Sequence, residues 1–202
     1  MAFLVCVTSF LTQPRDRSFQ PKAWKKIVKH TADANLGIVI FSTCGFASRP
    51  YKMPVMTKTI PQLFDPLAHR RNRQRAAATY ANFAFLKDEA ALRLADRVDL
   101  MRRDFDLCLD LGAHDGHLLT HLAPLGKIGT MLHSDPAAAF AKHAGKPFIV
   151  HDFASLPFAD GSFDAVFSCL SLHWVDDLPG LMVQIRRVLR PDGLCLINLL
   201  GG

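Results

Sequence analysis

Residues 109–116 have the sequence Leu-Asp-Leu-Gly-Ala-His-Asp-Gly and join an apolar run to a helical pattern. Gly112 allows the backbone to turn sharply after the apolar run. Gly116 has no Cβ, so a following helix or a ligand can approach the backbone closely. A glycine loop between a strand and a helix is typical of nucleotide-binding α/β proteins. The stretch therefore predicts a strand, a tight loop and a helix that face a ligand.

Short apolar runs alternate with helical patterns on the carboxyl side of this loop. The alternation predicts an α/β fold, a Rossmann-like parallel sheet with helices on both faces. On the amino side, apolar residues at helical spacing over 66–98 predict helices that divide near Asn82. The expected strands are 107–111, 128–133, 147–150, 165–168 and 194–199, and the expected helices of the body are 115–122, 137–143 and 178–189.

Candidate binding residues follow the second and third strands of this body, because such sheets bind ligands at the carboxyl ends of their strands. Asp135 stands nineteen residues beyond Gly116, where a carboxylate can accept hydrogen bonds from both hydroxyls of a ribose. The alternative is a turn aspartate before Pro136. Asp152 and Phe153 offer a polar acceptor and an apolar face of the kind that grips an adenine ring.

Other cofactor signatures do not fit. A dinucleotide fingerprint needs glycines at 112, 114 and 117, but His114 and His117 occupy two of these positions. The sequence also has no phosphate-binding G-x-x-x-x-G-K-[ST] loop. The five cysteines are far apart and form no C-x-x-C pair, which indicates neither a disulfide framework nor a structural zinc site.

The positive charge lies in the first part of the chain. Residues 1–60 hold nine of the 24 Lys and Arg residues and only two of the 18 acids, so the rest of the chain is close to neutral. A nucleic-acid partner is therefore not expected. The longest apolar stretches, 1–11 and 36–47, are too short to span a bilayer. We expect no transmembrane segment and a cytoplasmic location.

Three parts are predicted along the chain. Residues 1–58 form a basic extension, poorly ordered or non-native, and 59–104 a helical cap. Residues 105–202 form the core. The extension is either a targeting segment, which would make the location mitochondrial, or a basic interaction arm, or non-native sequence upstream of a start at Met53 or Met56; the last is favoured. A complete fold of this class adds two strands after the one ending near 199, so we expect a C-terminally incomplete core with an exposed edge.

The motifs together carry a resemblance over about residues 105–199. The loop from Asp110 to Gly116, Asp135, and the stretches 156–164 (LPFADGSFD), 170–174 (LSLHW) and 188–193 (VLRPDG) resemble class I S-adenosylmethionine-dependent methyltransferases of the type 11 group. More narrowly, 63–65 (LFD), 94–98 (LADRV) and 171–179 (SLHWVDDLP) resemble bacterial relatives of the mitochondrial complex I assembly factor 5. The malonyl carrier-protein methyltransferase of biotin synthesis is a more distant relative.

The resemblance implies S-adenosylmethionine as cofactor. It places the methionine end at Asp110, Gly112 and Gly116, the ribose at Asp135, and the adenine beside Asp152 and Phe153. Ala113, His114 and Ser168 are further candidate cofactor-binding residues. His114 departs from the family, which commonly has a second glycine there. A side chain at this position either crowds the cofactor or points outward.

The implied activity is methyl transfer to a protein or small-molecule acceptor that the sequence does not identify. The alternatives are hydroxylation of an arginine on a respiratory complex I subunit, and a non-catalytic assembly factor that retains the pocket. His173 is a candidate base near the reacting methyl group. The other interpretation makes His173 and Trp174 a packing element, with the indole closing the pocket.

Two further clusters have simpler explanations. His117 and His121, with His114 and Asp115 just before them, allow a metal site to be drawn. Solvent-facing histidines are favoured, so no metal is expected. The arginine run over 70–75 is expected to be a solvated helix face, or else a rim that attracts an acidic partner.

Overall fold

One seven-stranded sheet organises the protein. The computed structural model describes residues 2–9, 38–40 and 62–201. The strands are β1 (Ala2–Ser9), β2 (Ile38–Ile40), β3 (Phe105–Leu111), β4 (Ile128–Asp135), β5 (Phe148–Val150), β6 (Phe163–Cys169) and β7 (Leu189–Gly201), in the order β2-β1-β7-β6-β3-β4-β5. The run from β7 to β5 is parallel throughout, which confirms the predicted parallel α/β sheet.

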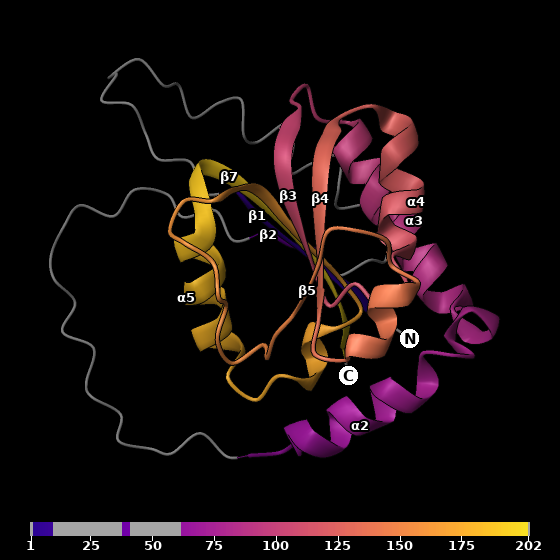
Figure 1. Ribbon diagram of the computed structural model, residues 1–202. Coiled ribbons are helices and arrows are strands. Elements are labelled where there is room, and N and C mark those ends of the chain that lie inside the picture. The colour runs from indigo at the N-terminus through magenta and orange to yellow at the C-terminus, as the bar shows by residue number, and fades with distance from the viewer. Residues whose placement is uncertain (1, 10–37, 41–61, 202) are drawn as a thin grey trace, which may run out of the picture.

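Helices cover both faces of this sheet. The α-helices are α2 (Pro66–Ala76), α3 (Phe85–Asp99), α4 (His117–Leu122) and α5 (Leu178–Val188), and the 3-10 helices are η1 (Tyr80–Phe83), η2 (Ala123–Leu125), η3 (Ala138–Lys142) and η4 (Leu172–Trp174). In Figure 1, α3 and α4 lie on one side of the strands and α5 lies on the other. The helical region predicted over 66–98 does divide, at η1, which contains Asn82.

Apolar side chains at helical spacing hold these layers together. In α3, Ala90, Leu94 and Val98 are buried and join Leu118 and Leu122 of α4 in one core cluster against the sheet. The buried residues of α5 belong to a second cluster on the opposite face. Such periodic burial is the main source of stability for short helices.

Helix α2 is different, because it has almost no apolar face. Its start is fixed by Asp65, whose carboxylate accepts hydrogen bonds from the backbone N–H groups of Leu67 and Ala68. Pro66 stands at the first helical position, where a missing N–H costs nothing. The only buried residue of the helix is Arg73. Its position on the protein therefore depends on a charged side chain.

The N-terminal segment covers the edge that the sequence predicted to be open. Strand β1 runs antiparallel to β7, from Ala2 opposite Gly201 to Ser9 opposite Leu194, and β2 pairs with β1. Both strands belong to residues 1–58, for which an extension outside the fold was expected. Unpaired backbone groups along β7 favour such a partner. The rest of that region, including Met53 and Met56, lies outside the described residues.

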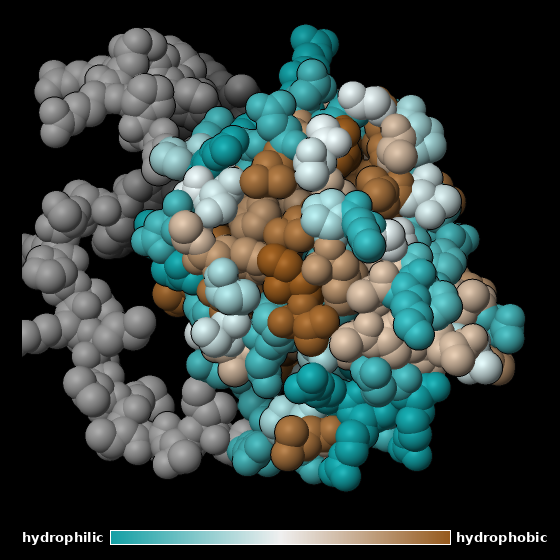
Figure 2. Space-filling view, in the orientation of Figure 1, coloured by the Kyte–Doolittle hydropathy of each residue, from teal (hydrophilic) through white to brown (hydrophobic). Residues whose placement is uncertain are grey.

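The other edge of the sheet is β5, which has only three residues. Figure 2 shows apolar side chains gathered in the middle of the face over β4 and β5, with hydrophilic ones around them. Val150 contributes to the exposed apolar surface there. Among the described residues, no helix has the length and apolar character needed to cross a membrane.

Candidate functional site

The loop after β3 is tied to the end of β4. The N–H groups of Gly112 and Ala113 both donate to the carbonyl of Ser134, at 2.8 and 2.9 Å. Gly112 has φ +80°, and a Cβ there would lie 2.3 Å from the Cβ of Ser171. Both the backbone angle and the close approach of Ser171 therefore require glycine.

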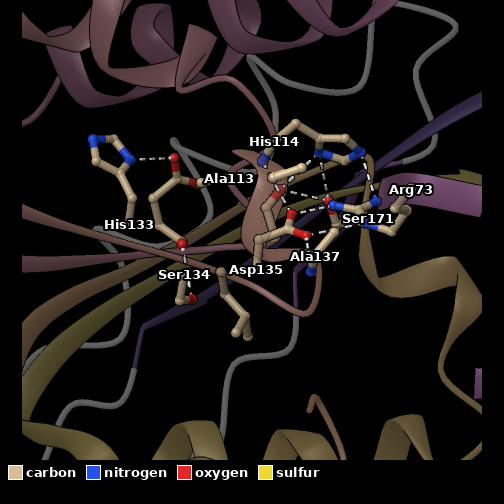
Figure 3. A network of polar contacts seen from close by, with 12 residues as sticks. Arg73, Ala113, His114, His133, Ser134, Asp135, Ala137 and Ser171 are labelled. Carbon is tan, nitrogen blue, oxygen red and sulfur yellow. Dashed lines mark hydrogen bonds and ion pairs between the residues drawn. The ribbon is translucent and has the colours of Figure 1, made fainter. Parts of the chain in front are cut away.

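Asp135 lies directly against this loop and is fully buried. Its Oδ2 accepts from the N–H of His114 at 3.1 Å, and its Oδ1 accepts from the N–H of Ala137 at 2.9 Å. Arg73 of α2 approaches the same carboxylate with both Nε and Nη2, forming a two-point ion pair. Figure 3 shows the guanidinium between the His114 ring and the Asp135 carboxylate. Four donors thus occupy the two oxygens of this carboxylate.

His114 stands where the resembling family commonly has a second glycine, and its side chain is buried. Its φ is +54°, and its ring stacks on Tyr80 with centroids 4.7 Å apart. The Nη1 of Arg73 lies 2.6 Å from Nε2 of the ring. Arginine can only donate, so Nε2 must be the acceptor and the proton of a neutral ring must be on Nδ1. Burial, Lys87 and Arg73 hold the pKa of His114 well below its ordinary value, in agreement with a neutral ring.

Lys87 of α3 completes the buried network. Its Nζ lies 3.1 Å from the carbonyl of Gly112, 2.9 Å from that of Ala113, and 2.6 Å from Nδ1 of His114. Nζ donates to the two carbonyls, and the Nδ1 proton of His114 also has an acceptor in the carbonyl of Gly112, at 2.9 Å. Burial lowers the pKa of Lys87.

A cavity of about 440 Å³ opens beside this network. Its lining includes Pro136, Val150, Asp152 and Phe153 at the ends of β4 and β5, His69 and Arg70 of α2, Trp174 of η4 and Leu181 of α5. The indole of Trp174 stacks on His69 with centroids 5.1 Å apart. A mostly apolar cleft of this size with a few polar groups is typical of small-molecule sites.

Three other residues predicted for the site, Asp110, Gly116 and Ser168, do not line the cavity. Asp110 and Ser168 are buried within the sheet, where Asp110 contacts Nδ1 of His133 at 3.1 Å and Ser168 donates to the carbonyl of Leu111 at 2.6 Å. Gly116 faces backbone, since a Cβ there would lie 2.8 Å from the carbonyl oxygen of Ala144. These residues therefore support the glycine loop and its strands.

His173 is the neighbour of Trp174 in η4, with ring centroids 5.3 Å apart. Trp174 lines the cavity, whereas His173 is not one of its lining residues. The Nδ1 of His173 is buried and has no hydrogen-bond partner among the described residues. Burial and Arg73 lower the pKa of His173. The ring is therefore neutral near pH 7, with a nitrogen available for a proton.

The histidines near α4 point to separate partners. His117 pairs with Asp115 at 2.6 Å, and His121 pairs with Asp88 at 2.7 Å, while His114 belongs to the buried network. Within the described part of the chain, no group of three or more His, Cys, Asp or Glu side chains could hold a metal ion.

The arginine run is not a uniform face. Arg70, Arg71 and Arg75 are exposed, as expected for a solvated helix face, but Arg73 is buried on Asp135. Sequence reasoning therefore missed the role of Arg73, and it missed Lys87 altogether. The sequence did carry one signal for both: Arg73 and Lys87 are charged residues at positions of a helix that face the protein interior.

Known proteins that resemble this chain have the same type of sheet. Residues 109–197 match the family described as Methyltransferase domain (Methyltransf_11). These residues have the fold of a methyltransferase domain. The rat protein named mitochondrial arginine-hydroxylase NDUFAF5 is 40% identical over 129 residues, covering 59% of this chain and 36% of its own length. Malonyl-[acyl-carrier protein] O-methyltransferase 1 of Coxiella burnetii is 33% identical over 146 residues, covering 72% of this chain and 51% of its own.

The chain thus spans about a third to half of the length of these curated relatives. Among solved structures, a chain of the Haloferax volcanii complex between the Trm112 methyltransferase activator and a methyltransferase has a TM-score of 0.55 at 25% identity, covering 62% of this chain and 58% of that one. An S-adenosyl-L-methionine-dependent methyltransferase from Methanococcus maripaludis has a TM-score of 0.54 at 17% identity, covering 61% and 62%. The fold is that of the Rossmann-like class I methyltransferases.

The matched residues fit the adenine of an adenosyl ligand, but the carboxylate predicted for its ribose is already paired with Arg73. The cavity beside Asp152 and Phe153 has the volume and the mixture of apolar and polar groups that an adenine needs. The carboxylate of Asp135 is the predicted acceptor for the ribose, but Arg73 uses both of its oxygens. A ribose can bind Asp135 only after this guanidinium has moved.

Proposed function

We propose that the methyltransferase domain binds S-adenosylmethionine across the carboxyl ends of β3, β4 and β5 and transfers the methyl group to a protein or small-molecule acceptor. The main support is that the glycine loop and Asp135 are in direct hydrogen-bond contact, 3.1 Å from the N–H of His114 to Oδ2. The loop follows β3 and the carboxylate ends the adjacent strand β4, and Trp174 lines the cavity beside them. Ligands of this fold class bind at that end of the sheet.

Each part of the ligand has a candidate partner. Asp135 accepts hydrogen bonds from the ribose hydroxyls, which favour a charged acceptor. Phe153 and Asp152 flank the adenine, and Trp174 closes the cavity over it. The backbone of the loop at Gly112 and Ala113 faces the methionine end. S-adenosylmethionine supplies a methyl group that is already activated for displacement, so positioning and exclusion of water are the main tasks of the chain.

His173 is the candidate base for an acceptor that must lose a proton. Its lowered pKa keeps the ring neutral near pH 7, and its Nδ1 is not committed to another group among the described residues. The ring is the neighbour of the Trp174 indole, with centroids 5.3 Å apart. A packing role for His173 predicts a loss of stability in His173→Ala without a specific loss of methyl transfer.

A second candidate function is hydroxylation of an arginine. It is supported by the 40% identity to the rat protein named an arginine-hydroxylase. The resemblance to complex I assembly factors makes a subunit of respiratory complex I the candidate acceptor, in a bacterial cytoplasm or a mitochondrion. A non-catalytic assembly factor would bind the same ligand without turnover.

Calorimetric titration with S-adenosylmethionine and S-adenosylhomocysteine tests ligand binding. We expect one site per chain and weaker binding by Asp152→Ala. The matched control is Asp160→Ala, because Asp160 is an exposed aspartate whose ion pair within the described residues is with Arg187. Absence of heat and of thermal stabilisation with both ligands would reject the proposal.

Mass spectrometry of acceptor candidates separates the reactions. Methylation adds one CH₂ to the acceptor, hydroxylation adds one oxygen atom, and a scaffold adds neither. Transfer of a labelled methyl group from the cofactor to an acceptor supports the methyltransferase, whereas oxygen addition with no methyl transfer supports the hydroxylase.

A further inference from the structure

The contact between α2 and the rest of the protein is centred on one buried charge. Arg73 is 7% exposed, and it is the only buried residue of the helix. Leu67 of the same helix is exposed. The remaining attachments are peripheral: the His69 ring stacks on Trp174, and the side chain of Gln74 accepts from the N–H of Ala139. The hydrophobic effect therefore contributes little to holding α2 in place.

The partner of Arg73 is the carboxylate that would bind the ribose. A buried carboxylate without a partner is strongly unfavourable, and the guanidinium satisfies Asp135 as long as no ligand is bound. Nη1 of Arg73 also satisfies Nε2 of His114. Ribose hydroxyls would take over the Asp135 oxygens that Nε and Nη2 now occupy. The ligand and Arg73 therefore compete for the same acceptor atoms.

We propose that Arg73 is a latch on the cofactor site: its ion pair with Asp135 holds α2 over the carboxyl ends of the strands, and binding of an adenosyl ligand releases the helix. This proposal rests on the proposed function, because it needs a ribose at Asp135. Binding and helix release are then coupled, since each requires the Arg73–Asp135 pair to break. The latch keeps the site closed and electrically satisfied until the ligand arrives.

Trp174 is placed to report the state of the latch. Its indole stacks on His69 of α2 and contacts the ring of Phe64 edge-on, with centroids 5.3 Å apart. Withdrawal of α2 removes the stacking on His69 and changes the fluorescence of the indole. The chain has two tryptophans, and Trp24→Phe leaves Trp174 as the only one.

The affinity test compares two arginine variants of the full chain. Arg73→Met keeps the length and apolar stem of the side chain but removes the guanidinium. We expect it to bind S-adenosylhomocysteine at least fivefold more tightly than the unmodified chain. Arg71→Met is the matched control, because Arg71 is exposed on the same helix and its hydrogen bond among the described residues is to the carbonyl of Leu67. It should bind with unchanged affinity. Arg73→Lys, which loses the two-point geometry and keeps the charge, should be intermediate.

A second measurement needs no variant at Arg73 and so does not depend on its folding. Trypsin cleaves after arginine, and α2 contains four of them. If ligand binding releases α2, S-adenosylhomocysteine accelerates trypsin cleavage within 66–76. It also changes Trp174 fluorescence in the Trp24→Phe background, and both effects increase with site occupancy. Arg71→Met gives the same ligand response.

The outcomes separate the latch from the site itself. Weaker binding by Arg73→Met, or ligand protection of α2 from trypsin, would make Arg73 part of the binding site and overturn the latch while the proposed function stands. Binding by neither the unmodified chain nor Arg73→Met would overturn both.

Discussion

Alanine at Gly112 should disrupt the loop that defines the site. Gly112 has φ +80°, which costs an L-residue about 1 to 2 kcal/mol. The new Cβ would lie 2.3 Å from the Cβ of Ser171, 2.5 Å from its Oγ and 3.2 Å from a ring carbon of Phe153. Neither the backbone nor the neighbouring side chains can remain where they are.

The size of the effect follows from these two terms. Overpacking in a dense interior typically costs about 1 to 3 kcal/mol, so the total loss of unfolding free energy should be about 2 to 5 kcal/mol. Such a loss is a large part of the stability of an ordinary domain, which is about 5 to 15 kcal/mol. Ser171 would also lose its 2.7 Å hydrogen bond to the carbonyl of Gly112.

Urea unfolding of matched variants separates backbone strain from steric overlap. Gly126→Ala is the control, because Gly126 has φ +68° and nothing within 4 Å of a Cβ. It should lose only the strain term, about 1 to 2 kcal/mol. The Gly112→Ala and Ser171→Gly pair should show a favourable coupling energy of about 1 to 3 kcal/mol, because removal of the Ser171 side chain relieves the overlap. Equal losses at positions 112 and 126, with no coupling, would refute the reasoning.

Two further predictions concern titratable groups. Because the pKa of folded His114 lies well below 6.5, the unfolded chain binds the extra proton, and the unfolding free energy should fall as the pH drops below about 6.5, by up to about 1.4 kcal/mol per pH unit for this group. Unfolding curves between pH 7 and 5 should show a shallower fall for His114→Asn, and an unchanged slope would contradict the assignment. Burial raises the pKa of the Cys108 and Cys169 thiols to about 12, so at pH 8 both should react with iodoacetamide only after unfolding. Rapid labelling of either thiol in the folded chain would count against the described core.

The elements of the body could be predicted from the sequence because each carries its own local signal. Apolar runs bounded by turns gave the parallel strands, and the 3.6-residue spacing gave α3 and α5. The expected helix over 137–143 is the short 3-10 helix η3, since too few residues there can pack against the sheet. The pairing of β1 with β7 was not predicted, because it joins opposite ends of the chain and no local pattern encodes it.

The candidate site was predictable only in part. The position of Asp135 beside the glycine loop follows from two adjacent strands that end at the same edge, and the structure places them in contact. The partners of Asp135 and His114 come from α2 and α3, far away in sequence. Whether Arg73 is exposed or buried depends on how these helices pack, which the spacing of charges does not determine.

The central claim is that Asp135 accepts the ribose of an adenosyl ligand, and it is tested most directly where Arg73 does not compete. Calorimetric titration of S-adenosylmethionine into Arg73→Met and into Arg73→Met with Asp135→Asn isolates the contribution of the carboxylate. The account predicts that the second variant binds at least tenfold more weakly, a difference of about 1.4 kcal/mol or more. Equal affinity in the two variants would contradict it.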